Sequence, residues 1–127
     1  MLWYVATPYT NYAGGHAAAS VLACQSTAWL LAAGVQCFSP IAHSHYVSAY
    51  LDPDIRMSHE FWMWADAPLM VASDGLIVVC APGWLESKGT QEEIRRFEAA
   101  GKPVIYWRQG DTIPTEVFAG TSTLSAR

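Results

Sequence analysis

The sequence predicts a single α/β domain, a three-layer sandwich in which a parallel sheet of about four or five strands carries helices on both faces. Short apolar runs alternate with segments long enough for helices, which is typical of parallel strands joined by helical crossovers. The clearest strand, Gly75 to Cys80, is apolar throughout, as in strands buried on both faces. With 52% apolar and 14% charged residues, the 127-residue chain has enough apolar surface for one core.

The first half of the chain is expected to supply two strands and a helix. Leu2 to Ala6, a β-branched and aromatic run, predicts a buried strand, and Val35 to Phe38 predicts the second. Between them, Ala13 to Ala33 predicts the first helix, which Gly34 ends at the C′ position. Ile41 to Arg56 is interpreted as a long loop with room for a helical turn, and loops of this length are usually functional.

The second half begins with a helix from its cap at Ser58 to about Ala72, in which Pro68 is expected to cause a kink or a restart. The strand Gly75 to Cys80 follows, and Ala81 to Ser87 is expected to be a loop. The carboxyl ends of parallel strands meet at one edge of the sheet. The loops that follow the strands are therefore expected to gather there, where ligands bind in such folds.

The C-terminal part holds the remaining elements of a single domain, residues 1–127. A further helix is expected to end at Gly101, and Lys102 to Trp107 is expected to be a strand. Residues 109–127 form a polar C-terminal tail, in which Thr112 to Phe118 is expected to add a short edge strand or helix.

Charge and composition exclude several classes of function. The net charge is −4 and the seven Lys and Arg residues are scattered, which argues against a nucleic-acid polymer as ligand but is compatible with a mononucleotide. The three cysteines, Cys24, Cys37 and Cys80, lack metal-ligand spacing and are expected to be reduced, which favours a cytoplasmic protein. No metal or cofactor is expected.

Residues 13–34 are long and apolar enough to raise the question of a membrane helix. Polar residues within the stretch and the lack of flanking Lys or Arg argue against it, and the N-terminus has no basic signal-peptide start. We interpret the stretch as an uncharged helix with no membrane role, covered by the sheet on one side and by a second subunit on the other. A homodimer or higher homo-oligomer is therefore expected.

The segment Ser87-Lys88-Gly89-Thr90-Gln91-Glu92-Glu93 is the first candidate site. Gly89 or Thr90 is expected to begin a helix, with Gly89 allowing a tight turn. The free N–H groups of the first turn, the two hydroxyls and the lysine together suit a phosphate. Glu93 lies about one turn further, where a carboxylate can attack an electron-poor carbon or stabilise an oxocarbenium ion. The alternative is an ordinary capping box, with Thr90 as the N-cap and Glu93 at the third position.

A carboxylate and a phenol are further candidates. Asp66 lies in a helix rich in Phe, Trp and Met, where a carboxylate is costly unless it is exposed or paired. It is therefore either a general acid or base, or a solvent-facing residue. The Tyr4 hydroxyl is placed to reach a carboxylate at the strand ends, or Tyr4 is simply a core residue. Asp74, just before the clearest strand, is interpreted as a turn residue.

Several side chains in the predicted loops are candidates for substrate contacts. His43 and His45 have metal-ligand chemistry but no partner that completes a metal site, so they are interpreted as part of a substrate-facing loop. Trp84, in the loop after the clearest strand, is placed to stack on a base. Thr7 and Tyr9 follow the first strand directly and open onto the same edge of the sheet.

Four features occur in a characteristic order. They are Tyr4-Val5-Ala6-Thr7-Pro8-Tyr9 on the first strand, Asp66 eight residues before Asp74, Gly89-Thr90-Gln91-Glu92-Glu93 on the next helix, and Gly101-Lys102-Pro103-Val104-Ile105 at the return strand. Over roughly Leu2 to Trp107, this order resembles the nucleoside 2-deoxyribosyltransferase superfamily, in particular a bacterial and phage branch. It is also similar to the deoxynucleoside 5′-monophosphate N-glycosidases. The fold that the resemblance implies is flavodoxin- or Rossmann-like.

The resemblance also implies a role for each matched residue. Glu93 would attack C1′ of the sugar, Asp66 would assist or orient the leaving base, and Tyr4 would hydrogen-bond Glu93. Six residues before the glutamate, transferases of free nucleosides carry an aspartate, whereas the monophosphate N-glycosidases carry a phosphate-binding serine. Ser87 occupies this position with Lys88 beside it, so the resemblance favours a nucleoside 5′-monophosphate as substrate and hydrolysis as the outcome.

Three other interpretations stay open. Gly89-Thr90-Gln91-Glu92-Glu93 also fits the Gly-Thr-x-x-Glu signature of cytokinin-releasing phosphoribohydrolases, although the Pro-Gly-Gly of those enzymes is matched only by the more distant Pro82-Gly83. A nucleotide or nucleotide-sugar binding module without turnover would use the same anion-binding features. The uncharged first helix and the six tryptophans also suit a structural or assembly protein.

Overall fold

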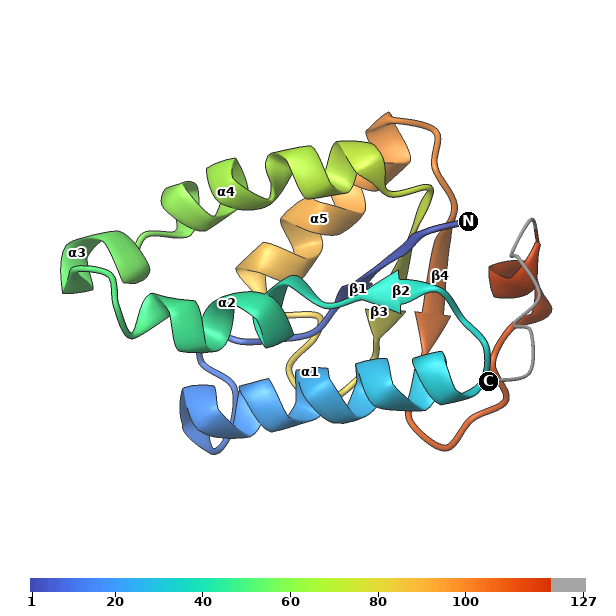
Figure 1. Ribbon diagram of the computed structural model, residues 1–127, viewed down its shortest axis with the longest axis horizontal. Coiled ribbons are helices and arrows are strands. Elements are labelled where there is room, and N and C mark those ends of the chain that lie inside the picture. The colour runs from blue at the N-terminus through green and yellow to red at the C-terminus, as the bar shows by residue number, and fades with distance from the viewer. Residues whose placement is uncertain (120–127) are drawn as a thin grey trace.

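Four parallel strands form a sheet in the order β2-β1-β3-β4 (Figure 1). The computed structural model describes residues 1–119 of the chain. Trp3 pairs with Cys37 on one side and with Gly75 on the other. The predicted α/β domain with a parallel sheet is confirmed, and its strands are Trp3–Ala6 (β1), Cys37–Phe38 (β2), Gly75–Val79 (β3) and Val104–Trp107 (β4).

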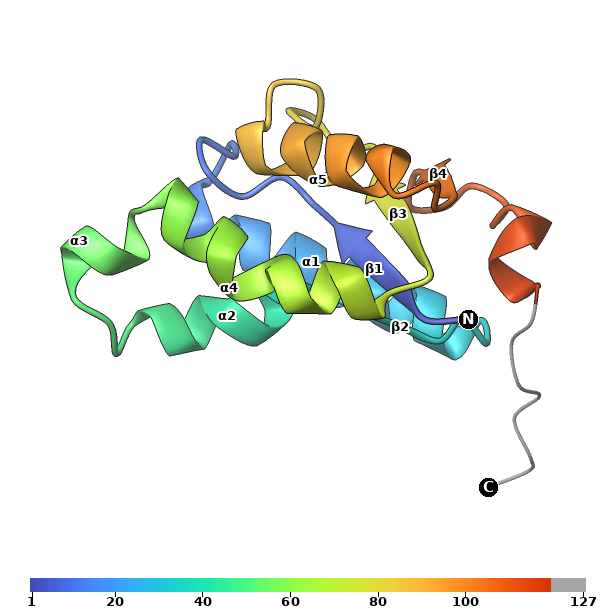
Figure 2. The ribbon, with the colours of Figure 1, turned by 90° about the horizontal axis from the view of Figure 1, so that it is seen from above.

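Helices cover both faces of the sheet, as the sequence predicts (Figures 1 and 2). They are Gly15–Ala32 (α1), Pro40–Ser48 (α2), Pro53–Arg56 (α3), His59–Ala72 (α4) and Lys88–Ala99 (α5), followed by a 3₁₀ helix, Thr115–Phe118 (η1). α1 packs on one face, and α4 and α5 pack on the other. The sheet is therefore the middle of three layers.

Successive side chains of the central strands lie on opposite faces of the sheet and pack in two different hydrophobic cores. Trp3 and Val5 pack on the α1 side, whereas Tyr4 and Ala6 pack on the side of α4 and α5. β3 alternates in the same way, and all five of its residues are buried, as its unbroken apolar sequence predicts. This alternation puts Tyr4 on the side of the sheet that also carries the helices of Asp66 and Glu93.

The prediction of a loop over residues 41–56 is wrong, because α2 and α3 occupy it. The Ser39 hydroxyl caps α2 by accepting a hydrogen bond from the Ala42 amide at 3.1 Å, and Pro40 is the first helical residue. Serine followed by proline is a favourable helix start, since the first helical N–H has no partner in any case. α3 likewise begins at Pro53. The two helices extend past one end of the sheet (Figure 1).

The longer helices agree with the sequence more closely. α1 lies within the predicted range 13–33, and Gly34 has a φ of 95°, as expected of a C′ glycine. Ser58 caps α4 as predicted. The helix then runs through Pro68 without the restart that was one of the two expected outcomes.

The C-terminal segment closes the core on the α1 side. η1 lies within the predicted range 112–118, so a helix and not an edge strand forms there. Val117 is fully buried, and its carbonyl oxygen accepts a hydrogen bond from Trp3 Nε1 at 2.9 Å. Trp3 also lies against Gly75, where an added Cβ would be 2.4 Å from the ring. Residues 120–127 of the predicted tail lie outside the described residues.

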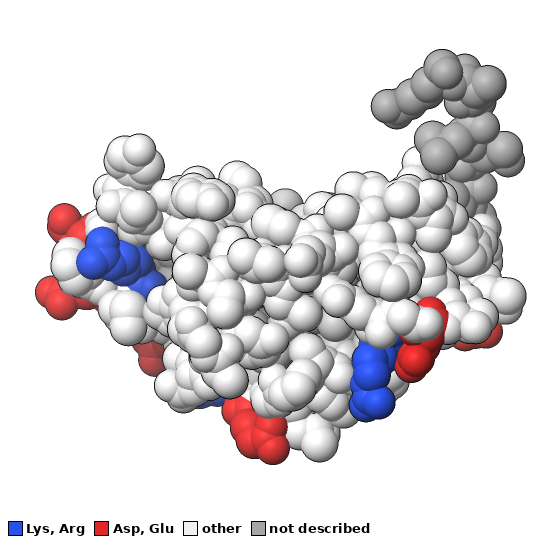
Figure 3. Space-filling model, turned by 90° about the horizontal axis from the view of Figure 1, so that it is seen from below, with Lys and Arg blue, Asp and Glu red and all other residues white. Residues whose placement is uncertain are grey.

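The outer side of α1 is largely apolar and carries no Asp, Glu, Lys or Arg. Figure 3 shows a continuous uncharged surface with charged atoms at its borders. Val21, Trp29 and Leu31 are all exposed on this helix. Within residues 1–119, no helix combines the length and hydropathy that crossing a bilayer requires.

Candidate active site

The candidate site lies at the carboxyl ends of β1 and β3, the two central strands. From β1 the chain passes to β2 on one side, and it then returns to β3 on the other side, so the strand order reverses between β1 and β3. In open parallel sheets such a reversal leaves a crevice at the carboxyl edge, and ligands bind there. The segment after β1 and the loop from β3 to α5 therefore border the expected binding position.

Three candidate residues from separate elements converge on one side of this edge. Tyr4 comes from β1, Asp66 from α4 and Glu93 from α5. Tyr4 is fully buried, Glu93 is 7% exposed and Asp66 is partly buried. The Tyr4 hydroxyl makes no hydrogen bond of standard geometry within the described residues, yet it lies close enough to both carboxyls to lower their pKa values. The structure thus brings together the three residues to which the resemblance assigns catalysis.

Asp66 and Glu93, the carboxyl pair, have different pKa values. Burial raises the pKa of Glu93 to about 8, against the lowering effect of the Tyr4 hydroxyl. Burial also raises the pKa of Asp66 to about 6, opposed by His43 and Tyr4. The pKa of Tyr4 is raised as well, first by burial and then by the charges of the carboxyl pair. Between these two pKa values the pair holds one proton, mainly on Glu93, and Asp66 is the ionised partner.

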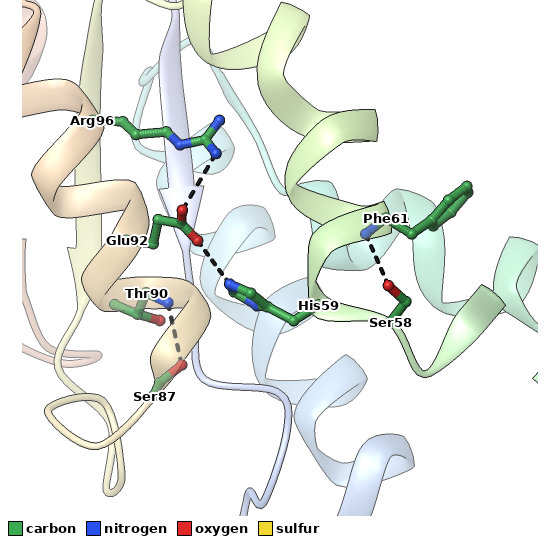
Figure 4. Close-up of polar contacts among 7 residues, drawn as sticks. All are labelled: Ser58, His59, Phe61, Ser87, Thr90, Glu92 and Arg96. Carbon is green, nitrogen blue, oxygen red and sulfur yellow. Dashed lines mark hydrogen bonds and ion pairs between the residues drawn. The ribbon is translucent and has the colours of Figure 1, made fainter. Parts of the chain in front are cut away.

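The start of α5 differs from the prediction. Ser87 is the N-cap, and its Oγ accepts a hydrogen bond from the Thr90 amide at 3.3 Å (Figure 4). The helix therefore begins at Lys88, and the prediction that Gly89 or Thr90 begins it is wrong. The capping-box interpretation of Glu93 is also wrong, because Glu93 lies six residues after the cap and not three. Capping therefore does not account for the burial of Glu93.

The first turn of α5 presents several groups to an anion. Gly89 lies inside the helix and has no positive φ, so the tight turn expected there is absent. A Cβ at Gly89 would meet nothing within 4 Å, which leaves open space beside the turn. Lys88 is exposed and forms no ion pair with the described residues. Ser87 Oγ accepts the capping hydrogen bond and keeps its own O–H to donate.

Three buried hydroxyls have no hydrogen-bond partner within the described residues, those of Tyr4, Thr7 and Thr90. Thr7 directly follows β1, and Thr90 lies in the first turn of α5. A buried hydroxyl without a partner costs roughly 1–3 kcal/mol, and such groups in folded proteins usually pair with water or a ligand. Since Tyr4 lies beside the carboxyl pair, the Thr7 and Thr90 hydroxyls are the two that a polar molecule bound at the carboxyl edge would satisfy.

α2 directs its two histidines toward different partners. His45 Nδ1 lies 2.8 Å from the Tyr9 hydroxyl, and the Tyr9 ring stacks on His16 with ring centroids 4.3 Å apart. His43 instead lies near Asp66, whose pKa it lowers. The region from 1 to 119 contains no cluster of three or more side chains suited to holding a metal ion. The histidines thus border the site from α2 as separate groups.

Two cavities lie near the candidate site, but the carboxyl pair lines neither of them. The larger, of about 650 Å³, lies beyond the ends of β3 and β4 and is lined by Trp84 and Arg108 among others. The smaller, of about 240 Å³, lies between α4 and α5 beside His59 and Glu92. The structure therefore does not bring Trp84 into one cavity with the carboxyl pair, and Glu93 itself is nearly closed from solvent.

A polar network between α4 and α5 was not predicted from the sequence. His59 Nε2 lies 2.7 Å from Glu92 Oε2, and Arg96 Nη2 lies 3.3 Å from Glu92 Oε1 (Figure 4). His59 first, and Arg96 after it, lower the pKa of Glu92. The four-residue spacing of Glu92 and Arg96 was a visible signal, whereas the contact with His59 depends on how the helices pack. The network joins the two helices that carry the carboxyl pair.

Comparisons with known proteins add one finding. Residues 2–109 match a protein family described as "Domain of unknown function (DUF1937)". A comparison with curated proteins finds no match. The matched range contains all four strands and the whole candidate site.

Proposed function

The chain belongs to the DUF1937 family, and we propose that it cleaves the N-glycosidic bond of a nucleoside or deoxynucleoside 5′-monophosphate. Glu93 is the nucleophile, Asp66 is the acid that protonates the leaving base, and Tyr4 positions Glu93. The observation that carries the proposal is the burial of the Glu93 carboxyl beside a second carboxyl and a phenol, at the edge of the sheet where ligands bind.

Because Glu93 has the higher pKa, the shared proton lies mainly on Glu93 in the free protein, and the reaction uses the form in which this proton has moved to Asp66 and Glu93 is ionised. A Glu93 oxygen forms a bond to C1′ while the bond from C1′ to the base nitrogen breaks, and its electrons leave with the base. Asp66 donates its proton to that nitrogen. Water then attacks C1′ and gives a proton to Asp66, while the bond from C1′ to the Glu93 oxygen breaks and its electrons return to the Glu93 carboxylate. The sugar phosphate is released in this step, or a second base takes the place of water.

The first turn of α5 is proposed to bind the 5′-phosphate. Its N–H groups, the Ser87 hydroxyl, the buried Thr90 hydroxyl and the Lys88 ammonium all favour an anion. A glycine at position 89 lets the phosphate approach the backbone, since no side chain covers it. Thr7 is proposed to contribute a further hydroxyl from the end of β1.

The base is proposed to lie toward α2, where Tyr9, His43 and His45 are placed. Because Glu93 is more than nine-tenths buried, the sugar reaches it only after neighbouring side chains move. Trp84, which lines the larger cavity, is not proposed to contact the base.

A panel of ribo- and deoxyribonucleoside 5′-monophosphates, with release of free base as the measurement, tests the proposal. Glu93→Gln is expected to reduce base release by roughly 10³–10⁵-fold while nucleotide binding persists. Glu98→Gln removes the charge of an exposed carboxylate on the same helix, and its rate of base release is expected to equal that of the wild-type protein. Binding without base release in the wild-type protein would contradict catalysis and indicate a binding module. Release from ribonucleotides alone would favour a phosphoribohydrolase.

Ser87→Asp tests the phosphate subsite within the same assay. Aspartate is as good an N-cap as serine, so the helix is expected to be retained. The added negative charge is expected to raise KM for monophosphates and to leave nucleosides unaffected. An equal effect on both substrate types would place the phosphate elsewhere.

We also propose that the uncharged side of α1 packs on a second copy of the chain in a homodimer or higher oligomer. Burying this surface requires no desolvation of charge, unlike most exposed helix surfaces. A cytoplasmic location is proposed as well, since all three cysteines are free thiols.

A further inference from the structure

The larger cavity has the size and position of a second small-molecule site. Its volume of about 650 Å³ lies in the range of roughly 300–1,000 Å³ that is typical of such sites. It lies beyond the carboxyl ends of β3 and β4, with walls from the β3–α5 loop, the segment after β4, and α1. The carboxyl pair does not line it, so the cavity is a separate position from the buried pair.

The walls combine aromatic and aliphatic surface. Trp84 and Tyr12 supply two aromatic rings, and Leu22 and Val79 supply aliphatic side chains. The Trp84 ring packs against Tyr106, with ring centroids 5.6 Å apart, so it is braced from one side. A braced indole beside apolar side chains favours a flat apolar ligand, because little side-chain entropy is lost on binding.

Arg108 supplies the cavity with a positive charge and with N–H donors that are available to a ligand. Its Nε donates to the Cys80 carbonyl oxygen at 3.4 Å, and its guanidinium forms no ion pair within residues 1–119. With Nε held, the two terminal nitrogens are left to bind a carboxylate. Gln109 beside it is held by a 2.7 Å hydrogen bond from its Nε2 to Ser26 Oγ, which leaves its side-chain oxygen as an acceptor.

Glu86 limits the charge of the ligand. This exposed carboxylate also lines the cavity, so the site contains one cation and one anion. A dianion such as a phosphomonoester would meet repulsion from Glu86 that a monoanion meets less strongly. The cavity therefore differs in charge preference from the first turn of α5, which has an unpaired lysine.

We propose that this cavity binds a planar aromatic compound that carries one carboxylate. The ring lies against Trp84, and the carboxylate is bound by the terminal nitrogens of Arg108. Binding is independent of base release.

Titration with indole-3-acetate tests the assignment. Indole-3-acetamide serves as the uncharged control ligand, and acetate serves as the control ligand without a ring. The indole N–H signals of the six tryptophans are followed by NMR, and Trp84→Phe identifies the signal of Trp84. Indole-3-acetate is expected to shift this signal. It is expected to bind at least about tenfold more tightly than either control ligand, because a charge-assisted hydrogen bond from Arg108 stabilises only a ligand that has both the ring and the carboxylate.

Arg108→Gln is expected to abolish the difference between acid and amide. Arg95→Gln, which removes an exposed arginine of α5 outside the cavity, is expected to keep that difference. Arg108→Lys keeps the charge without the planar donor pair and is expected to bind the acid with intermediate affinity. An unchanged spectrum outside the cavity shows that each variant is folded.

Three results would overturn the proposal. The first is equal affinity for acid and amide in the wild-type protein. The second is an equal effect of Arg108→Gln and Arg95→Gln. The third is a Trp84 signal that does not move at indole-3-acetate concentrations up to about 10 mM, well above a Kd expected for a specific site.

Discussion

The chemistry of Glu93 depends on residues that are distant from it in the sequence. Its side chain is buried beside Tyr4 from the first strand and Asp66 from another helix. Burial raises the pKa of Glu93 to about 8 and that of Asp66 to about 6. The two carboxyls therefore titrate in separate steps and share one proton around neutral pH. Two predictions about pH follow from this arrangement.

The first prediction concerns activity. The kcat/KM for base release is expected to follow a bell-shaped pH profile, with limbs near pH 6 and pH 8. At low pH both carboxyls are protonated and the nucleophile is lost, and at high pH both are ionised and the acid is lost. Asp66→Asn is expected to remove one limb. A flat profile across this range would contradict the shared-proton arrangement.

The second prediction concerns stability and is independent of function. The pKa of Glu93 is about 8 in the folded protein against an ordinary 4.5, so the folded state holds this proton more tightly. Its stabilising effect is complete below pH 4.5 and is lost as the pH rises through 8. The free energy of unfolding is therefore expected to fall with rising pH, by at most about 1.4 kcal/mol per pH unit.

Urea unfolding at a series of pH values measures this slope. The side chain introduced by Glu93→Gln cannot titrate, so the stability of this variant is expected to stay nearly constant above about pH 7, where Asp66 is already largely ionised. Glu98→Gln on the exposed side of the same helix is expected to retain the wild-type slope. Parallel curves for wild type and Glu93→Gln would show that Glu93 is not the titrating group.

At the level of elements, the helices that carry the site are held by contacts between their ends. Glu92 of α5 pairs with His59 at the start of α4. At the other end, Lys102 Nζ donates to the carbonyl oxygens of Met70 and Val71 in α4, both at 2.9 Å. Lys102 belongs to one of the motifs behind the family resemblance, and its contacts here are structural. A cation at a helix C-terminus satisfies carbonyls that have no partner within the helix.

Lys102→Met is expected to lower the free energy of unfolding by about 1–2 kcal/mol, since it removes both charged hydrogen bonds but keeps the aliphatic stem. Lys88→Met serves as the control. It removes the same charge from the start of α5, where a cation is unfavourable, so it is expected to be neutral or slightly stabilising. Chemical denaturation compares the two variants, and equal losses would contradict the capping role of Lys102.

At the level of the whole molecule, Trp3 of the first strand contacts both β3 in the middle of the chain and η1 near the end of the described residues. Its ring fills the space left by the missing side chain of Gly75, and its Nε1 binds the Val117 carbonyl oxygen. The α1 side of the core is thereby closed by a segment that belongs to a predicted polar tail. The outer surface of α1, by contrast, has no covering within the described residues.

Sedimentation tests the proposal that a second copy covers α1. The wild-type protein is expected to be a dimer or larger at micromolar concentration, and Leu31→Lys is expected to shift it toward the monomer by placing a charge in an apolar interface. Val71→Lys, on the exposed side of α4, is expected to leave assembly unchanged. A monomeric wild-type protein, or equal effects of both lysines, would contradict this interface.

Several elements were predictable because their signals are local. The strand at 75–79 is an unbroken apolar run, and the caps at Ser58 and Ser87 satisfy amides only three residues away. The same local signal, Ser39 followed by Pro40, was present at α2 and was missed because the segment's length and composition favoured a loop. At α5 Thr90 was the expected cap of the capping-box alternative, whereas Ser87, three residues earlier and with the same kind of hydroxyl, is the cap in the structure.

The sequence by itself determined the parallel α/β architecture, because unbroken apolar strands and helix-length crossovers allow few other arrangements. It also supplied Tyr4, Asp66 and Glu93 as candidates. Only the tertiary structure decided that these three side chains lie together and that His43 and His45 have different partners. It also decided that Trp84 lines a cavity that the carboxyl pair does not line. The physical reason is that burial and mutual charge effects arise from segments far apart in the chain, whereas helix caps and strand patterns arise from neighbours.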